Sequence, residues 1–136
     1  RIDSFHTGFN LDAIATYQQN TGDSRFQKHI DKGWKFYINN FFENDGASKY
    51  YHNQKFPIDI HCPAQVIVTS SKLNNFTLNK LQLEGILNWT IGNMQHSKGF
   101  FYYQLNKIVN SKISYMRWSN AFMFNAMAHF YLKSFK

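Results

Sequence analysis

The clearest pattern of apolar and polar positions in this sequence lies between residues 23 and 42. Apolar side chains recur at the spacing of one face of an α-helix, at Phe26, Ile30, Trp34, Tyr37 and Phe41. Basic side chains occupy the opposite face, at Arg25, Lys28, Lys32 and Lys35. The pattern predicts an amphipathic helix with its apolar face buried and its basic face in solvent.

A helix is also predicted immediately before this one, from Asn10 as its N-cap to about Gln19. Gly22 ends it, because glycine readily adopts the left-handed conformation of a helix C-terminus. Asp23 then caps the amphipathic helix. A connection this short predicts two antiparallel helices that pack side by side as a hairpin.

The segment from Pro63 to about Leu73 allows two interpretations. Its β-branched residues, Val66, Ile67 and Val68, favour a strand. Proline in a first helical turn favours a helix, as does the equivalence of this segment with other parts of the chain. We predict a helix.

Two more helices are predicted in the second half of the chain. One runs from Leu78 to about Met94, and the other from Ser119, as its cap, to about Lys133. The last helix is apolar almost all round, which predicts burial between other elements. Its polar residues Asn125 and His129 lie one turn apart, and we expect a satisfied core pair rather than a site.

The loops between these helices share recurring features. A short strand is predicted at Lys49 to His52, and Tyr50-Tyr51 resembles Tyr102-Tyr103. His6, His61 and Arg117 precede or begin successive helices, at spacings of 55 and 56 residues. Recurrence at a fixed period indicates an array of helical hairpins.

These units predict a single all-α domain over residues 1–136, built from antiparallel helical hairpins with short β-strands in the loops between them. If the array curves, the N-termini of its inner helices gather at one end. His6, His61 and Arg117 would then converge on a shared cleft. Helix N-termini carry partial positive charge, which favours the carboxylates or phosphates of a ligand.

Composition narrows the choice of partners. Aromatic residues make up 18% of the 136 residues, which indicates a folded chain. The net charge of +7 raises the question of nucleic acid, but no nucleic-acid-binding motif accompanies it and we do not expect that partner.

No apolar run has the length of a membrane-spanning helix and no signal peptide is visible, so we expect a cytoplasmic protein without a membrane partner. Cys62 is the only cysteine, and we expect neither a metal nor another cofactor.

Three stretches carry a resemblance to a known family: residues 21–42 (TGDSRFQKHIDKGWKFYINNFF), 50–65 (YYHNQKFPIDIHCPAQ) and 115–127 (YMRWSNAFMFNAM). They resemble the C-terminal part of six-hairpin glycosidase-like proteins, in particular a subgroup found among polysaccharide-biosynthesis proteins. The resemblance implies an (α/α) toroid whose central cleft binds sugars. A complete toroid needs more hairpins than this chain supplies. We therefore expect a partial toroid, completed by a second copy or by another part of the protein.

Asp59 and His61 are the candidate catalytic residues. They alternate around Ile60, so in an extended backbone both side chains point to the same side. The carboxylate would then orient the imidazole for general acid/base chemistry, as in a sugar epimerase or lyase. The structural alternative is that Asp59 accepts hydrogen bonds from backbone N–H groups at the start of a helix while His61 packs in the loop.

The candidate ligand-binding residues follow from the repeat and from the resemblance. His6 and Arg117 are the counterparts of His61, and they either face the ligand or hold their loops. Arginine at such a position suits an anionic sugar. Aromatic rings that could stack on a sugar are Trp118 and the two Tyr-Tyr pairs. Only one ring of each pair can face the cleft from a strand, and we choose Tyr51 and Tyr103.

Two functions remain open from the sequence. The first is a carbohydrate-active or saccharide-binding domain linked to polysaccharide metabolism. Glycoside hydrolysis usually needs two carboxylates, but only Asp59 and Asp3 fall in predicted cleft loops, so we do not expect a complete glycosidase in this chain. The second is a non-catalytic helical scaffold or protein-interaction module that retains the fold without the chemistry.

Overall fold

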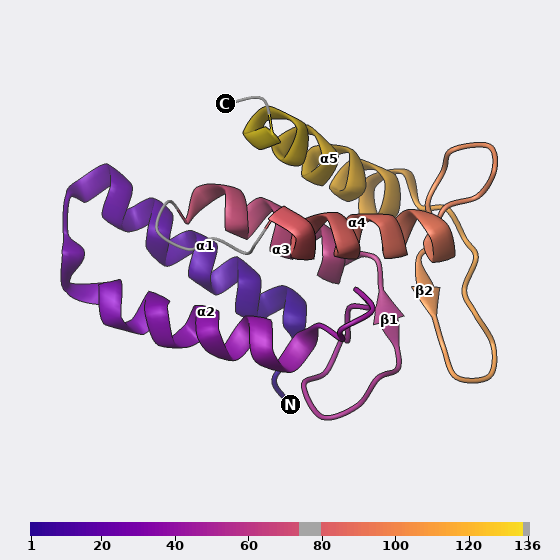
Figure 1. Cartoon of the computed structure of the whole chain (residues 1–136), viewed down its shortest axis with the longest axis horizontal. Helices are drawn as coiled ribbons and strands as arrows, with labels where there is room; N and C mark the ends of the chain where they lie inside the picture. Colours follow the sequence, from indigo (N-terminus) through magenta and orange to yellow (C-terminus); the bar gives the residue numbers. More distant parts are fainter. Residues whose placement is uncertain (74–79, 135–136) are drawn as a thin grey trace.

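The structure is a computed structural model that describes residues 1–73 and 80–134. Its elements in chain order are α1 (Ser4–Thr21), the 3-10 turn η1 (Ser24–Phe26), α2 (Gln27–Phe41), β1 (Ile58–Asp59), α3 (His61–Lys72), α4 (Lys80–Met94), β2 (Gln104–Leu105), the π-helical turn η2 (Met116–Asn120) and α5 (Ala121–Ser134) (Figure 1). Helices dominate, and the one sheet among the described residues has two strands of two residues each. The predicted all-α class is confirmed. None of the described helices combines the length and the hydropathy needed to cross a lipid bilayer.

Helix α3 lies at the centre of the molecule and contacts α1, α4 and α5 (Figure 1). Every residue from 62 to 70 is buried, which explains why the β-branched run Val66 to Val68 folds as a helix. These side chains pack against neighbouring helices on several sides, and that tertiary burial outweighs their local preference for strand. The predicted helix from Pro63 to Leu73 is therefore confirmed.

The first helical hairpin has the predicted connection. Gly22 adopts a φ of 71°, and its N–H donates to the carbonyl oxygen of Gln18. The Asp23 side chain accepts from the Arg25 N–H at the start of η1, which leads directly into α2. The hairpin begins earlier than predicted: α1 starts at Ser4 rather than after Asn10, because the Asp3 carboxylate caps it.

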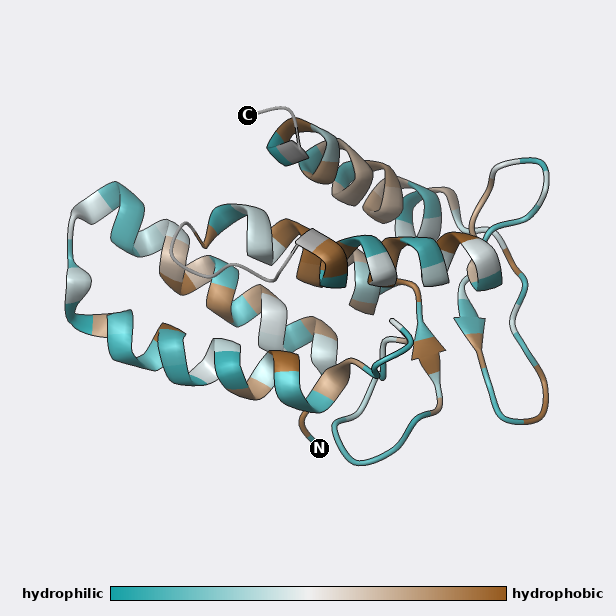
Figure 2. Ribbon diagram, viewed as in Figure 1, coloured by the Kyte–Doolittle hydropathy of each residue, from teal (hydrophilic) through white to brown (hydrophobic). Residues whose placement is uncertain are grey.

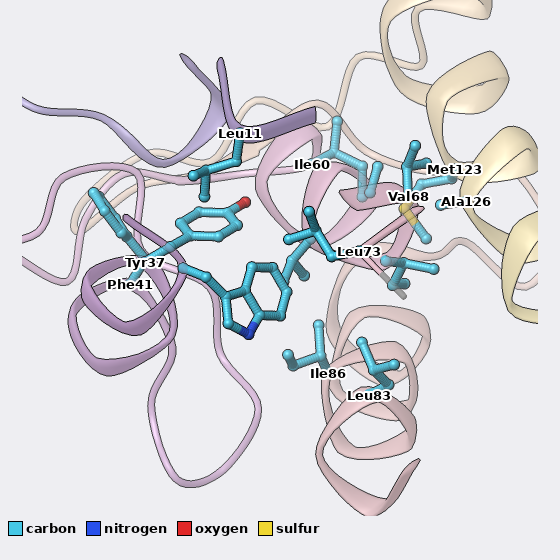
Figure 3. Close-up of a cluster of buried hydrophobic side chains, with 14 of the residues drawn as sticks. Leu11, Tyr37, Phe41, Ile60, Val68, Leu73, Leu83, Ile86, Met123 and Ala126 are labelled. Carbon is cyan, nitrogen blue, oxygen red and sulfur yellow. The ribbon is translucent and has the colours of Figure 1, made fainter. Parts of the chain in front are cut away.

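The amphipathic pattern of α2 is confirmed apart from its first position. Ile30, Trp34, Tyr37 and Phe41 are buried, whereas Phe26 is 39% exposed. The basic residues Arg25, Lys28, Lys32 and Lys35 are all exposed, and Figure 2 shows the polar outer face of α2. Figure 3 shows Tyr37 and Phe41 packed beside Leu11 of α1, in a core that continues to Val68, Met123 and Ala126.

The predicted strand at Lys49 to His52 is wrong. Between residues 49 and 52 only Tyr51 takes part in isolated bridges, with Asp3 and Gln54. The backbone of Tyr50 bonds to two other segments: Ser4 N–H donates to its carbonyl oxygen, and its own N–H donates to the carbonyl oxygen of Pro57. The regular strand is β1, which pairs antiparallel with β2.

The last helix departs from two predictions. It begins at η2 rather than with Ser119 as a cap, and Ser119 is buried inside that turn. It is also buried on one side only, since Met123 is inaccessible while Phe124 is 73% exposed and Leu132 is 61% exposed. The reason is that α5 packs mainly on α3 in the described structure.

The predicted pair of Asn125 and His129 is wrong as well. Nδ1 of His129 lies 2.8 Å from the Ser71 hydroxyl of α3, and Asn125 is exposed.

Helix α4 ends at Met94 as predicted, while its predicted start at Leu78 lies outside the described residues.

Candidate functional site

A pocket with a volume of about 570 Å³ opens where the chain enters α1, α3 and α5. Three helices therefore contribute their first turns to one site, together with the segments that precede β1 and β2. Most of the lining side chains carry rings: Phe5, His6, Tyr50, Asp59, His61, Tyr103, Trp118 and Phe122.

Asp59 and His61 form a tightly bonded pair on one wall of this pocket. One carboxylate oxygen of Asp59, Oδ1, lies 2.7 Å from Nδ1 of His61 and accepts from the His61 backbone N–H at 3.0 Å. The other oxygen, Oδ2, accepts from Nε2 of Gln104 at 3.0 Å. Because an ionised carboxylate only accepts hydrogen bonds, Nδ1 of His61 is the nitrogen that donates to Asp59, and Nε2 is the nitrogen left for another partner.

The ring of His61 is held on its faces and edges by three aromatic residues. Its centroid lies 4.7 Å from that of Phe122, 5.4 Å from that of Phe5 and 6.2 Å from that of Tyr103. The His61 side chain is 16% exposed and that of Asp59 only 3%. Within the described part of the chain no hydrogen bond to Nε2 of His61 is found. The imidazole is therefore fixed in position, with its second nitrogen free for a ligand.

A second pair of the same kind stands at the start of α1. The Asp3 carboxylate accepts from the His6 backbone N–H at 2.8 Å and lies 2.9 Å from Nδ1 of His6. His6 is much more open than His61, with 67% of its side chain exposed. The ring of Phe5 touches both imidazoles at centroid distances of 5.4 Å. The pocket thus holds two carboxylate-bound histidines, one enclosed and one at the rim.

The two helix starts are structural counterparts, and the backbone shows which residues correspond. Ser4 N–H donates to the carbonyl oxygen of Tyr50 at the start of α1, and Ile60 N–H donates to that of Tyr103 just before α3. The loops that follow α2 and α4 also share a pattern of backbone hydrogen bonds, displaced by 53 residues, so that Gly46 corresponds to Gly99. In the first loop the N–H groups of Lys49, Glu43 and Gly46 donate to the carbonyl oxygens of Phe41, Ala47 and Glu43. In the second loop the N–H groups of Tyr102, His96 and Gly99 donate, in the same order, to those of Met94, Phe100 and His96. Tyr50 therefore corresponds to Tyr103, and both rings line the pocket.

Both tyrosines have perturbed acidity. Burial, followed by the negative charges of Asp3 and Asp59, raises the pKa of Tyr50 to about 12. Burial and then the charge of Asp59 also raise the pKa of Tyr103. Both phenols therefore remain protonated at neutral pH, as hydrogen-bond donors for a ligand.

Five of the predicted site residues meet in this pocket: His6, Asp59, His61, Tyr103 and Trp118. Tyr51 and Arg117 do not line it. The ring of Tyr51 lies beside Tyr50 and beneath the Arg1 guanidinium, and Arg117 is exposed on η2.

The sequence analysis missed Phe5 and Phe122, and from the first Tyr-Tyr pair it chose Tyr51, whereas Tyr50 lines the pocket. Aligning the loops on the glycines Gly46 and Gly99, instead of on the Tyr-Tyr pairs, would have matched Tyr50 to Tyr103. Phe5 and Phe122 lie in the first turns of inner helices, but nothing in their sequence context separates them from core residues.

The chemistry available here is proton transfer and ring stacking. An imidazole nitrogen held opposite a carboxylate can accept or donate a proton near neutral pH, and the aromatic rings offer flat apolar faces. In residues 1–73 and 80–134 no three His, Cys, Asp or Glu side chains are grouped so that they could hold a metal ion.

Comparison of this chain with protein-family models, curated proteins and solved structures finds no match. The case for a function therefore rests on the site itself.

Proposed function

We propose that this pocket binds a saccharide and that the chain is part of an (α/α) toroid of the six-hairpin glycosidase-like kind. The observation that carries the proposal is a ring-lined pocket, at the first turns of three neighbouring helices, that contains two carboxylate-bound histidines. Sugar rings present flat C–H faces that pack on aromatic rings, and hydroxyl groups that exchange hydrogen bonds with polar side chains. The pocket offers both kinds of contact.

The roles of the lining residues follow from their exposure and bonding. Trp118 is 56% exposed and lies at the rim, where its face is available for stacking. Tyr50 and Tyr103 donate hydrogen bonds from their phenols. Nε2 of His61 acts as the general acid/base, because Asp59 fixes its tautomer and aromatic neighbours fix its ring. Arg117, exposed on the same turn as Trp118, attracts an anionic sugar as it approaches.

The test uses a panel of neutral and acidic oligosaccharides, with binding measured by thermal shift and calorimetry. Trp118→Ala removes a stacking face and is expected to weaken binding about two- to tenfold. His61→Asn keeps a nitrogen donor toward Asp59 but removes Nε2, and it should abolish turnover while leaving more of the binding intact. His29→Asn, on the exposed face of α2, is the matched control. A chain that binds no saccharide, or variants that all bind like the wild type, would refute the proposal.

The second candidate is a scaffold that pairs with a second copy, and the exposed apolar side of α5 favours it. Phe124 and Leu132 are more than half exposed on a helix whose other side is buried, and such surfaces often mark interfaces. Light scattering decides between the two: a dimer that Phe124→Ser converts to a monomer supports this candidate. If the protein is a monomer that binds sugar, only the first candidate remains.

A further inference from the structure

The segment after β2 forms a closed hairpin that projects from the helical body (Figure 1). Gln104 and Ser111 exchange both backbone hydrogen bonds, at 3.1 and 2.8 Å. The Asn110 side chain accepts from the Asn106 N–H at 2.8 Å, which closes the turn from inside. The base of the hairpin is tied to the pocket, because Gln104 pairs with Asp59 of β1. The tip is therefore held in a defined position.

This tip presents apolar side chains to solvent. Ile108 is 91% exposed and Val109 is 75% exposed, and Figure 2 shows the hydrophobic colour at the end of the loop. Ile113 and Met116 follow the hairpin in the chain and are 56% and 78% exposed. Single exposed apolar residues are ordinary, but a cluster at the end of a projecting loop marks a contact surface.

The charges around the tip all have one sign. Lys107 and Lys112 flank the apolar pair and both are exposed, and Arg117 follows on η2. The sequence contains no acidic residue after Glu84, whereas residues 85–136 contain six basic ones: Lys98, Lys107, Lys112, Arg117, Lys133 and Lys136. The net charge of +7 is therefore concentrated in the part of the chain that carries the hairpin.

We propose that this hairpin, residues 104–112, docks the protein on the surface of an anionic lipid bilayer. Ile108 and Val109 enter the interfacial layer, while Lys107 and Lys112 contact negatively charged headgroups. This proposal departs from the expectation of no membrane partner, which rests on the lack of a spanning run and of a signal peptide. Docking at a surface needs only an exposed apolar tip and nearby positive charge. The inference is independent of the proposed saccharide site.

Charge complementarity favours lipid over the other occupants. A second copy would bring the same basic hairpin to the contact, and like charges repel. A nucleic acid would engage the lysines but would gain little from Ile108 and Val109. An anionic bilayer satisfies both features, because it offers negative headgroups directly above an apolar layer.

The experiment is co-sedimentation of the full chain with vesicles of phosphatidylcholine alone, or with about one third phosphatidylserine. The wild type should bind only the anionic vesicles. Lys107→Gln with Lys112→Gln should lower the partition coefficient roughly 30-fold. Ile108→Ser with Val109→Ser should lower it roughly tenfold or more.

Two control pairs match these variants. Lys28→Gln with Lys32→Gln makes the same charge change on the exposed face of α2. Ile2→Ser with Ile91→Ser makes the same polarity change at exposed positions outside the hairpin. Both control pairs should bind the anionic vesicles like the wild type. The proposal is overturned if the wild type ignores these vesicles, if the α2 pair weakens binding as much as the hairpin lysines do, or if the serine pair at the tip has no effect. A change of oligomeric state in the tip variants without a change in vesicle binding would assign the hairpin to a second copy instead.

Discussion

Replacing Asp59 with alanine should destabilise the fold far more than the same change at Asp3. Asp3 is the N-cap of α1, Asp59 accepts from the N–H of the first residue of α3, and each carboxylate holds a histidine, but their surroundings differ. Asp59 is almost inaccessible and accepts three hydrogen bonds, two from His61 and one from Gln104. Asp3 is 18% exposed at its side chain, and its histidine is mostly in water.

The magnitudes follow from what each substitution leaves behind. Asp59→Ala strands a backbone N–H, a ring N–H and an amide in a place with little access to water. An unsatisfied buried donor costs about 1–3 kcal/mol, so the three together cost roughly 3–5 kcal/mol. At Asp3, water can replace the lost acceptor at the rim, so the cost is that of an ordinary N-cap, about 1 kcal/mol. Asp59→Asn retains an acceptor for the His61 N–H and should fall between the two values.

Urea denaturation followed by far-UV circular dichroism measures all three variants as differences in the free energy of unfolding. A gap of at least 2 kcal/mol between Asp59→Ala and Asp3→Ala is expected. Equal costs at the two positions would refute the reasoning, because burial would then not govern the strength of the pair.

Three further predictions concern other parts of the fold. Gly46→Ala places a Cβ 2.5 Å from the carbonyl oxygen of Gly85 at a φ of 93°, and it should lower the free energy of unfolding by about 3–4 kcal/mol in urea denaturation. Gly99→Ala has a similar φ of 91° but no atom within 4 Å, so it should cost about 1–2 kcal/mol. Similar values for the two variants would contradict the predicted clash. Burial raises the pKa of the Cys62 thiol, so Ellman's reagent should label it in denaturant and hardly at all in the folded protein. Burial raises the pKa of Tyr50 from 10.0 to about 12. The protonated phenol therefore contributes fully to stability below about pH 10, and this contribution is lost as the pH rises toward 12. The fall in the free energy of unfolding over that range should be smaller in Tyr50→Phe.

The first hairpin could be predicted because its signals are local. The apolar face of α2 shows the helical period directly, and Gly22 followed by Asp23 encodes both the end of one helix and the cap of the next. The start of α1 was missed because Asp3 lies close to the beginning of the sequence, while Asn10 looked like an equally good cap. Helix capping depends on backbone conformation, and two nearby candidates cannot be ranked from residue type alone.

The outer side of α5 could not be predicted from its composition. An apolar helix is normally buried all round, yet burial depends on how many neighbours the fold provides, and α5 rests mainly on α3. The same limit applies to the site. The repeat spacing predicted that His6 and His61 come together, but whether Arg117 or Trp118 faces the pocket is a matter of helical phase at η2, which the sequence does not reveal.

The third helix start shows why the pocket is asymmetric. Tyr115 is the N-cap of η2, as Asp3 is the N-cap of α1. Tyrosine offers no carboxylate to cap the turn, and the N–H groups of Ser119 and Asn120 both donate to the Tyr115 carbonyl oxygen, which widens the turn into the π-helical η2.

At this helix start the repeat spacing places Arg117 where the others have a histidine, and Tyr115 is the N-cap where α1 has Asp3. The widened turn instead contributes Trp118, and Phe122 follows in α5. Two walls of the pocket therefore carry carboxylate-bound imidazoles and the third carries aromatic rings. For the proposed saccharide, this division would place a stacking surface and a candidate acid/base in one pocket, as acid/base chemistry on a positioned sugar requires.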